Sequence, residues 1–271
     1  MPATTPGRVS LDRYLERLAY GGALHPSHAT LEALHLAHAM HIPFENLDVL
    51  LGRRVDLSLE ALQRKLVESP RGGYCFEQNL LFGAVLEDLG FPVTPLAARV
   101  RHNTTAVLPR THMLLLVETE RGRHLADVGF GGEGLLHPVP FEPGYVSRQY
   151  LWSYRVAEEG SHFVLQSLRA GEWRDLYVFS LERQERVDYE MANYWISTHP
   201  ASRFVQTLTA QRPTPEARFI LRNRELTIDR GDDTTTREIR DRVDLIDVLD
   251  SYFSLRLPPE TAFPKLFDRS T

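Results

Sequence analysis

The stretch Arg71-Gly72-Gly73-Tyr74-Cys75-Phe76-Glu77-Gln78-Asn79 joins a pair of glycines to the start of a predicted helix. Apolar residues recur beyond it at helical spacing, and Gly90 marks the end of the helix. Cys75 is therefore expected at a helix N-terminus, where unpaired backbone N–H groups and the helix dipole stabilise an anion such as a thiolate. This context favours a nucleophile, although a free cysteine is often a small core residue.

The composition is that of an ordinary globular protein. The 271 residues are 42% hydrophobic and 25% charged, which allows one large domain or two or three small ones. The formal net charge is -5 and charges of both signs are interleaved, so no basic face for nucleic acid or a membrane surface is indicated. A single cysteine allows no internal disulfide, which fits a reducing compartment.

The first residues lack the apolar stretch of a signal peptide, and the longest apolar run, residues 113–117, is too short to cross a bilayer. We therefore expect a soluble, cytoplasmic protein with small-molecule partners, present as a monomer or a homodimer.

Helices are predicted over the first ninety residues from the apolar spacing and the positions of helix breakers. The expected features are a helix capped by Ser10 and ended by Gly21-Gly22, a second capped by Thr30 and ended at Ile42-Pro43, a third capped by Ser58, and a fourth from Cys75 to Gly90.

Beyond Phe91-Pro92 the pattern changes from helical to extended, which predicts a domain boundary there. The expected strands cover residues 94–100, 111–118, 124–128, 150–156, 162–166 and 173–179, and form a mostly antiparallel sheet or barrel. A helix over 187–196, two strands near Phe219 and Leu226 joined by a turn at Asn223, and a helix over 243–253 complete an α+β fold.

His112 and Asp127 are candidates for the base that activates the thiol and for the acid that orients this base. The chain has eleven histidines, so position has to discriminate among them. His112 begins a buried strand, and Asp127 lies in the next strand after a hairpin connection around residues 120–123. With an even number of loop residues, both side chains fall on one face of the sheet. A hydrogen-bonded core histidine and a strand-end acid remain the alternative.

Two further patterns are candidates for ligand-binding sites. His35, His38 and His41 recur every three residues on a predicted helix, but the pattern drifts around the helix and lacks an H-E-x-x-H motif, so we expect packed histidines and no metal. The stretch Val128-Gly129-Phe130-Gly131-Gly132 can bring backbone N–H groups against a phosphate or an acyl chain, or can form a tight turn. It fits neither an ATP-binding nor an NAD-binding motif.

Four ordered segments resemble the arylamine N-acetyltransferase family. Residues 71–79 are similar to its nucleophile motif, R-G-G-x-C-x-E-x-N. The other three are Ile42-Pro43-Phe44-Glu45-Asn46-Leu47, Thr111-His112-Met113 and Asp127-Val128-Gly129-Phe130-Gly131-Gly132. Asn193 and the stretch from Ser197 to Phe204 resemble the family's segment between barrel and lid, so the likeness extends over about residues 40 to 204.

The resemblance implies that Cys75 is the acyl-accepting nucleophile, His112 its base and Asp127 the orienting acid. It implies an N-terminal helical domain (residues 1–90), a β-barrel domain (91–200) and a C-terminal α/β lid (201–271). It also implies acetyl transfer from acetyl-CoA to an arylamine, an arylhydrazine or an N-hydroxyarylamine, without a metal. The residues expected to contact coenzyme A are Thr111, Phe130, Gly131 and Phe204.

Three other functions share parts of this pattern. A cysteine hydrolase or a transglutaminase-like enzyme would use the same three residue types without acetyl-CoA. An amide synthase that closes a polyketide macrolactam would be a near relative. A catalytically silent binding protein would keep the fold without acylation.

Overall fold

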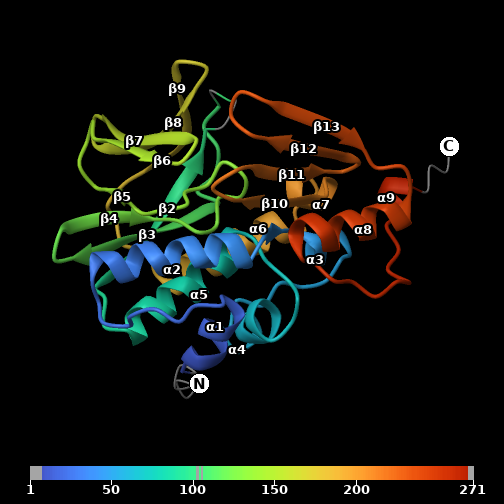
Figure 1. Ribbon diagram of the computed structural model, residues 1–271, viewed down its shortest axis with the longest axis horizontal. Helices are drawn as coiled ribbons and strands as arrows, with labels where there is room; N and C mark the ends of the chain where they lie inside the picture. Colours follow the sequence, from blue (N-terminus) through green and yellow to red (C-terminus); the bar gives the residue numbers. More distant parts are fainter. Residues whose placement is uncertain (1–7, 102–103, 105, 268–271) are drawn as a thin grey trace.

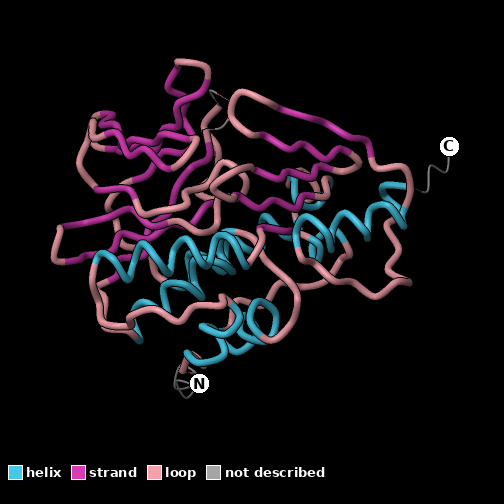
Figure 2. The backbone as a smooth tube through the Cα atoms, viewed as in Figure 1, coloured by secondary structure: helices cyan, strands magenta, loops and turns pink. Residues whose placement is uncertain are grey.

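The computed structural model describes residues 8–101, 104 and 106–267. Two antiparallel sheets lie side by side, with most of the helices gathered along one side of them (Figures 1 and 2). This arrangement confirms the predicted α+β class.

The helices of the first part of the chain follow the apolar pattern, with two differences at their caps. Ser58 accepts a bond from the Ala61 N–H as predicted, but the second helix begins two residues before Thr30, because the Ser27 side chain accepts from the Thr30 N–H. Ser10 makes no side-chain cap bond. The elements are α1 (Leu11–Arg17), α2 (His28–His41), α3 (Leu47–Leu50), α4 (Leu59–Leu62), a π-helical turn η1 (Gln63–Val67) and α5 (Cys75–Asp88).

The larger sheet has eight antiparallel strands in the order β5-β4-β3-β2-β9-β8-β7-β6 and curls into a nearly closed barrel. The central strands are apolar on both faces, because helices cover one face and the barrel interior the other. Its strands are β2 (Val93–Val100), β3 (His112–Thr119), β4 (Gly122–Ala126), β5 (Val139–Pro140), β6 (Val146–Gln149), β7 (Trp152–Glu159), β8 (His162–Arg169) and β9 (Glu172–Phe179).

The smaller sheet has the order β1-β10-β11-β12-β13. The turn between β11 and β12 contains Asn223 at a φ of 51°, as predicted, since asparagine tolerates the left-handed region. Its strands are β1 (Phe44–Glu45), β10 (Thr209–Pro213), β11 (Arg218–Arg222), β12 (Glu225–Asp229) and β13 (Thr234–Glu238); the remaining helices are α6 (Arg186–Thr198), α7 (Arg203–Gln206), α8 (Arg242–Phe253) and α9 (Pro264–Phe267).

The apolar core that surrounds Cys75 joins the helices to the barrel. Met113 and Leu115 of β3 belong to the same buried cluster as α2 and α5, and Tyr189 and Ile196 bring α6 into it. α2 and α5 run along the β2–β4 part of the barrel (Figure 1), and α5 packs on β2 and β3. The division of the chain at residues 90 and 200 stays a prediction.

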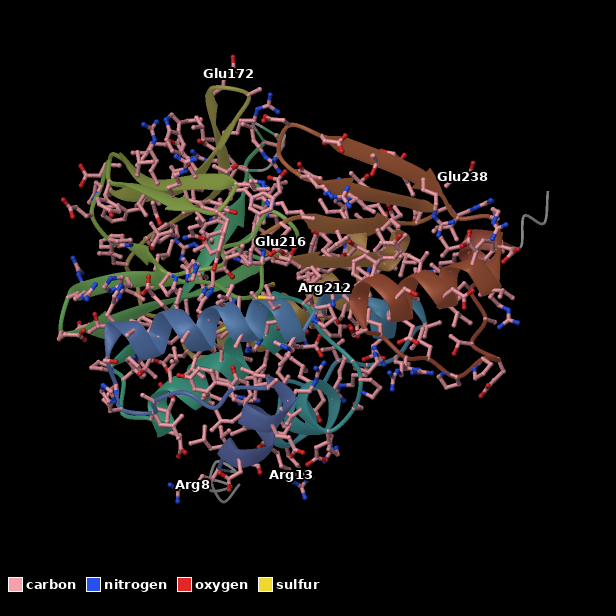
Figure 3. All side chains as sticks on the ribbon, viewed as in Figure 1. Arg8, Arg13, Glu172, Arg212, Glu216 and Glu238 are labelled. Atoms are coloured by element: carbon pink, nitrogen blue, oxygen red, sulfur yellow. The ribbon has the colours of Figure 1, made fainter. Side chains whose placement is uncertain are left out.

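Charged side chains of both signs are interspersed around the molecule (Figure 3). Arg8, Glu172 and Glu238, labelled there, point outward from three separate regions. Among the described residues, no helix has the length and apolar character needed to cross a membrane.

Candidate active site

Cys75 is the first residue of α5, as the glycine pair before it predicted. The residue is 3% exposed, and its Sγ lies 3.5 Å from the backbone O of Thr111, the residue before β3. The backbone N–H groups of a helix's first turn have no partners within the helix. The thiol therefore lies where partial positive charge and the barrel edge meet.

The two glycines before Cys75 are required by close packing. A Cβ at Gly72 would lie 1.9 Å from the backbone O of Pro43, and one at Gly73 would lie 2.7 Å from Glu77 Oε2. The Glu45 N–H donates to the Gly73 O at 3.0 Å, and the Gly73 N–H donates to the Pro43 O at 3.3 Å. The upstream stretch 42–47 and the nucleophile stretch 71–79 are thus two halves of one local structure.

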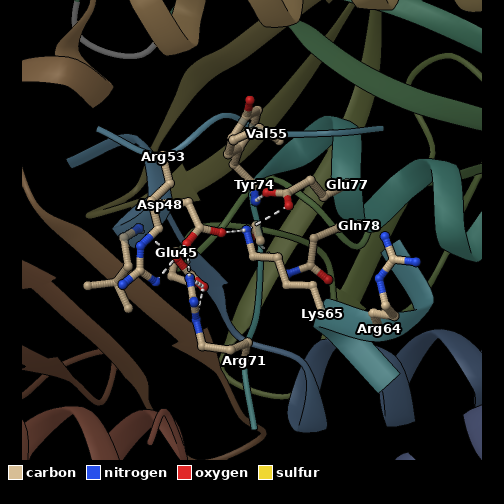
Figure 4. Close-up of polar contacts among 12 residues, drawn as sticks. Glu45, Asp48, Arg53, Val55, Arg64, Lys65, Arg71, Tyr74, Glu77 and Gln78 are labelled. Carbon is tan, nitrogen blue, oxygen red and sulfur yellow. Dashed lines mark hydrogen bonds and ion pairs between the residues drawn. The ribbon is translucent and has the colours of Figure 1, made fainter. Parts of the chain in front are cut away.

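A buried charge cluster, drawn in Figure 4, holds these two stretches together. Arg71 Nη2 lies 2.7 Å from Glu45 Oε1, and Lys65 Nζ lies 2.7 Å from both Asp48 Oδ2 and Glu77 Oε1. The other oxygen of Glu77 accepts the Tyr74 N–H at 3.1 Å and so caps the helix that begins with Cys75. The charges of the cluster fix the turn that carries Cys75.

His112 and Asp127 meet in the interior. His112 Nε2 lies 2.7 Å from Asp127 Oδ2, and both residues are at most 3% exposed. The ladder between β3 and β4 runs from the pair Thr119 and Gly122, next to a two-residue turn, to the pair Leu115 and Ala126. The predicted even loop, and with it the shared sheet face, is therefore confirmed. Asp127 lies just beyond the last ladder pair, diagonal to His112. The connection is shorter than the predicted 120–123, because β4 already begins at Gly122.

The Asp127 carboxylate is held on its second oxygen as well. Oδ1 accepts from Asn79 Nδ2 at 3.0 Å and from the Gly129 N–H at 2.9 Å. A Cβ at Gly129 would lie 2.7 Å from the Cα of Cys75, so only glycine lets this loop lie against Cys75. Asn79, which lies on α5 as Cys75 does, thus connects this helix to Asp127.

Electrostatics favour a charged pair of His112 and Asp127. Burial lowers the pKa of His112, but Asp127, followed by Cys75, outweighs burial and raises it to about 10. Burial raises the pKa of Asp127, but His112, Asn79 and the Gly129 N–H bring it below its ordinary value. With Nε2 directed at Asp127, the other ring nitrogen, Nδ1, is the one left for the thiol.

The four residues expected at coenzyme A lie around this centre. Phe130 packs edge-on to the His112 ring at 5.1 Å between centroids, and Gly131 has a φ of +91° that favours glycine. Phe204 packs against Tyr74, the residue before Cys75, with 5.5 Å between ring centroids. Thr111 contacts the thiol through its carbonyl. Their contacts with a coenzyme stay predictions.

Several residues near the site were not predicted from the sequence. Asn79 lies within the nucleophile stretch, but nothing in its spacing indicates a bond to Asp127, a residue far along the chain. Asn46 donates to the carbonyl groups of Phe204 and Thr207 at 2.8 and 2.7 Å and accepts from the Thr209 N–H. It ties the stretch 42–47 to the smaller sheet, which no short-range pattern reveals.

The histidines of α2 are packed, as expected, and the ring nitrogens of His35 and His38 have protein partners. His38 Nε2 lies 2.7 Å from Gln78 Oε1, and its Nδ1 lies 2.7 Å from the Tyr14 hydroxyl. The Gln78 amide in turn donates to the Gly73 O at 3.2 Å. Among the described residues, no group of three or more His, Cys, Asp or Glu is arranged to hold a metal ion.

The buried His38 should make the protein less stable in acid. Burial lowers the pKa of His38 to about 3, although the bond that His38 makes to the Gln78 amide oxygen acts in the opposite direction. The unfolded chain therefore takes up the proton first, and stability is lost as the pH falls below the ordinary value of 6.5. We expect His38 to account for about 3 kcal/mol of lost unfolding free energy by about pH 4.

Guanidinium unfolding of the wild type and His38→Gln at a series of pH values checks this. The variant should have a lower free energy of unfolding than the wild type at pH 7, and this difference should become smaller as the pH falls. A difference that is the same at every pH would contradict the prediction.

The chain is similar to known acetyltransferases. A family model described as N-acetyltransferase matches residues 27–262. The arylamine N-acetyltransferase of Mycolicibacterium smegmatis is 41% identical over 255 residues, covering 92% of this chain and 93% of that protein. The arylamine N-acetyltransferase / N-hydroxyarylamine O-acetyltransferase of Salmonella typhimurium is 43% identical over 192 residues, covering 70% of this chain and 68% of that protein.

A solved structure has the same fold. The structure of Mycobacterium marinum arylamine N-acetyltransferase in complex with CoA superposes with a TM-score of 0.89 at 38% identity, covering 95% of this chain and 97% of that one. A buried Cys, His and Asp meet where α5 begins beside the start of β3, an arrangement of residue types that acyl-transfer enzymes use. The chain belongs to the arylamine N-acetyltransferase family, which confirms the resemblance drawn from its motifs and makes it an acetyltransferase.

Proposed function

We propose that this enzyme transfers the acetyl group of acetyl-CoA to an arylamine, an arylhydrazine or an N-hydroxyarylamine through an acetyl-Cys75 thioester. The observation that carries the proposal is the position of His112, bonded to Asp127 and directed at the only cysteine of the chain. The names of the relatives support the acceptor class, and the CoA complex of the M. marinum enzyme supports the donor.

In the first half-reaction, His112 holds the proton of the Cys75 thiol as an imidazolium, and the Cys75 thiolate attacks the thioester carbonyl of acetyl-CoA. The bond from carbonyl carbon to Cys75 Sγ forms, the bond to the sulfur of CoA breaks, and the imidazolium returns its proton to the leaving thiolate. Because one thioester replaces another, the exchange is nearly isoenergetic and requires neither a metal nor a nucleotide.

In the second half-reaction, the amine nitrogen attacks the acetyl carbon and the bond from that carbon to Sγ breaks. His112 accepts the proton that the nitrogen loses and passes it to the departing Cys75 thiolate. Aromatic amines and hydrazines are neutral near pH 7 and carry a free lone pair, whereas alkylamines are protonated. The half-buried rings of Phe130 and Phe204 suit a flat acceptor.

The acetyl-enzyme is the direct test. Incubation of the protein with acetyl-CoA and no amine is expected to add one acetyl group to the peptide that contains Cys75, measured by mass spectrometry. Release of one equivalent of CoA should accompany it, and an arylamine should then remove the label. An unmodified peptide in folded protein would contradict the proposal, and steady release of acetate without amine would indicate a hydrolase.

We propose the cytoplasm as the compartment of this enzyme. A mechanism that depends on a free thiol works best where thiols stay reduced, which favours the cytoplasm. Fractionation of cells that express the protein, with immunoblotting, locates it.

A further inference from the structure

His35 is a buried titratable side chain that the proposed reaction does not use. It is on α2, is 0% exposed, and its ring packs edge-on against Phe82 of α5, with 5.7 Å between centroids. Both of its ring nitrogens are engaged by the main chain of one segment, residues 127–136, which begins with Asp127.

The two bonds allow only one form of the imidazole. Nδ1 lies 3.1 Å from the carbonyl O of Leu136, which can only accept, so Nδ1 carries the hydrogen. Nε2 lies 3.1 Å from the backbone N of Asp127, which can only donate, so Nε2 is bare. Burial lowers the pKa of His35 to about 4, against the opposing bond to Leu136, and so keeps the ring neutral at neutral pH.

The two bonds of His35 lie at the two ends of segment 127–136. The β3–β4 ladder ends at Ala126, so the Asp127 N–H lies beyond the ladder. It donates instead to Nε2 of His35. At the other end of the segment, the Leu136 carbonyl receives the second bond. One side chain therefore fastens both ends of the loop that carries Gly129 against the nucleophile and Phe130 against His112.

We infer that His35 is a positioning residue, whose neutral imidazole fixes the main chain of Asp127 and both ends of segment 127–136 so that the Asp127 carboxylate is aimed at His112. Asn79 and the Gly129 N–H hold the carboxylate, and Asn79 Oδ1 also accepts the Val128 N–H at 3.1 Å. The bond to the Asp127 N–H itself comes from His35. The inference rests on the proposed role of Asp127 in activating Cys75.

Three substitutions separate the two bonds of His35. The amide of glutamine reaches the place of Nε2 and can accept the Asp127 N–H, whereas the amide of asparagine reaches only the place of Nδ1 and can donate to Leu136. Leucine keeps apolar volume and makes neither bond. His41→Gln, on the same helix, is the matched control, because the Nδ1 of His41 bonds the Ala37 O of its own helix.

The rate of alkylation of Cys75 by iodoacetamide is measured for each variant from pH 5 to pH 10, together with the NMR titration of His112. We expect His35→Leu and His35→Asn to slow alkylation at pH 7 by roughly ten-fold to a hundred-fold, as displaced catalytic groups do. The pKa of His112 should fall in both. His35→Gln should stay within about three-fold of the wild type, and His41→Gln should match it.

Equal rates for His35→Gln and His35→Asn, or wild-type rate and His112 titration in a folded His35→Leu, would overturn the inference. If His35→Leu fails to fold, the comparison of glutamine with asparagine still decides. The alkylation assay contains no acetyl-CoA or amine, so it tests the role of His35 separately from the proposed function. If the wild type forms the acetyl-enzyme but the His35 variants are alkylated at the wild-type rate, the role of His35 alone is refuted. If the wild type never forms the acetyl-enzyme, the proposed function is refuted.

Discussion

Cys75→Ala is expected to lose all measurable release of CoA from acetyl-CoA, with or without an arylamine. Removal of the nucleophile leaves no atom to accept the acetyl group, and the loss should reach about 10⁴-fold or more, as in other enzymes deprived of their nucleophile. The fold should survive, because alanine keeps the apolar contact at the helix start. CoA release, followed with a thiol reagent in protein-free filtrates, measures the effect.

Cys75→Ser provides the second arm of this test. The hydroxyl has nearly the size of the thiol but is a much weaker acid, so His112 cannot hold it as an anion and activity should remain near background. Because the chain has one cysteine, loss of iodoacetamide labelling in both variants verifies the substitution. Residual activity within ten-fold of the wild type, in folded protein, would show that acyl transfer bypasses Cys75.

Asp127→Asn is expected to slow acetylation of Cys75 by about 10³-fold to 10⁴-fold while the fold stays intact. Asp127 Oδ1 accepts from two donors, Asn79 Nδ2 and the Gly129 N–H, so the amide oxygen of the variant must occupy that place. Its NH₂ group then faces His112 Nε2, which must become an acceptor. The ring proton moves to Nδ1, and His112 can no longer take the proton of the thiol.

The measurement is single-turnover acetylation of Cys75 together with NMR titration of His112. Because Asp127 is the chief influence that raises the pKa of His112, the substitution should lower that pKa. Asp175→Asn is the matched control, since Asp175 on β9 bonds Gln166 and Arg101 and lies outside the group of Cys75, His112 and Asp127. A wild-type acetylation rate in Asp127→Asn would argue against the proposed role of Asp127.

Local patterns predicted most elements of the fold. α5, β3 and α8 were predicted to within two residues at each end, because apolar period, glycine and caps all act over short distances. β1 and α3 were missed, since two or four residues carry no period. The strand β1 exists because β10, distant in sequence, pairs with it.

The sequence by itself determined the helix start at Cys75 and the family, and it placed His112 and Asp127 on one sheet face only on the condition of an even loop. These rest on local chain geometry or on ordered motifs. Only the tertiary structure decided that Asn79 and His35 hold Asp127, and that Glu45 and Arg71 pair. Such bonds join side chains whose approach depends on how helices dock on the barrel. The free energy of that docking comes from burial of the whole core, which no short stretch encodes.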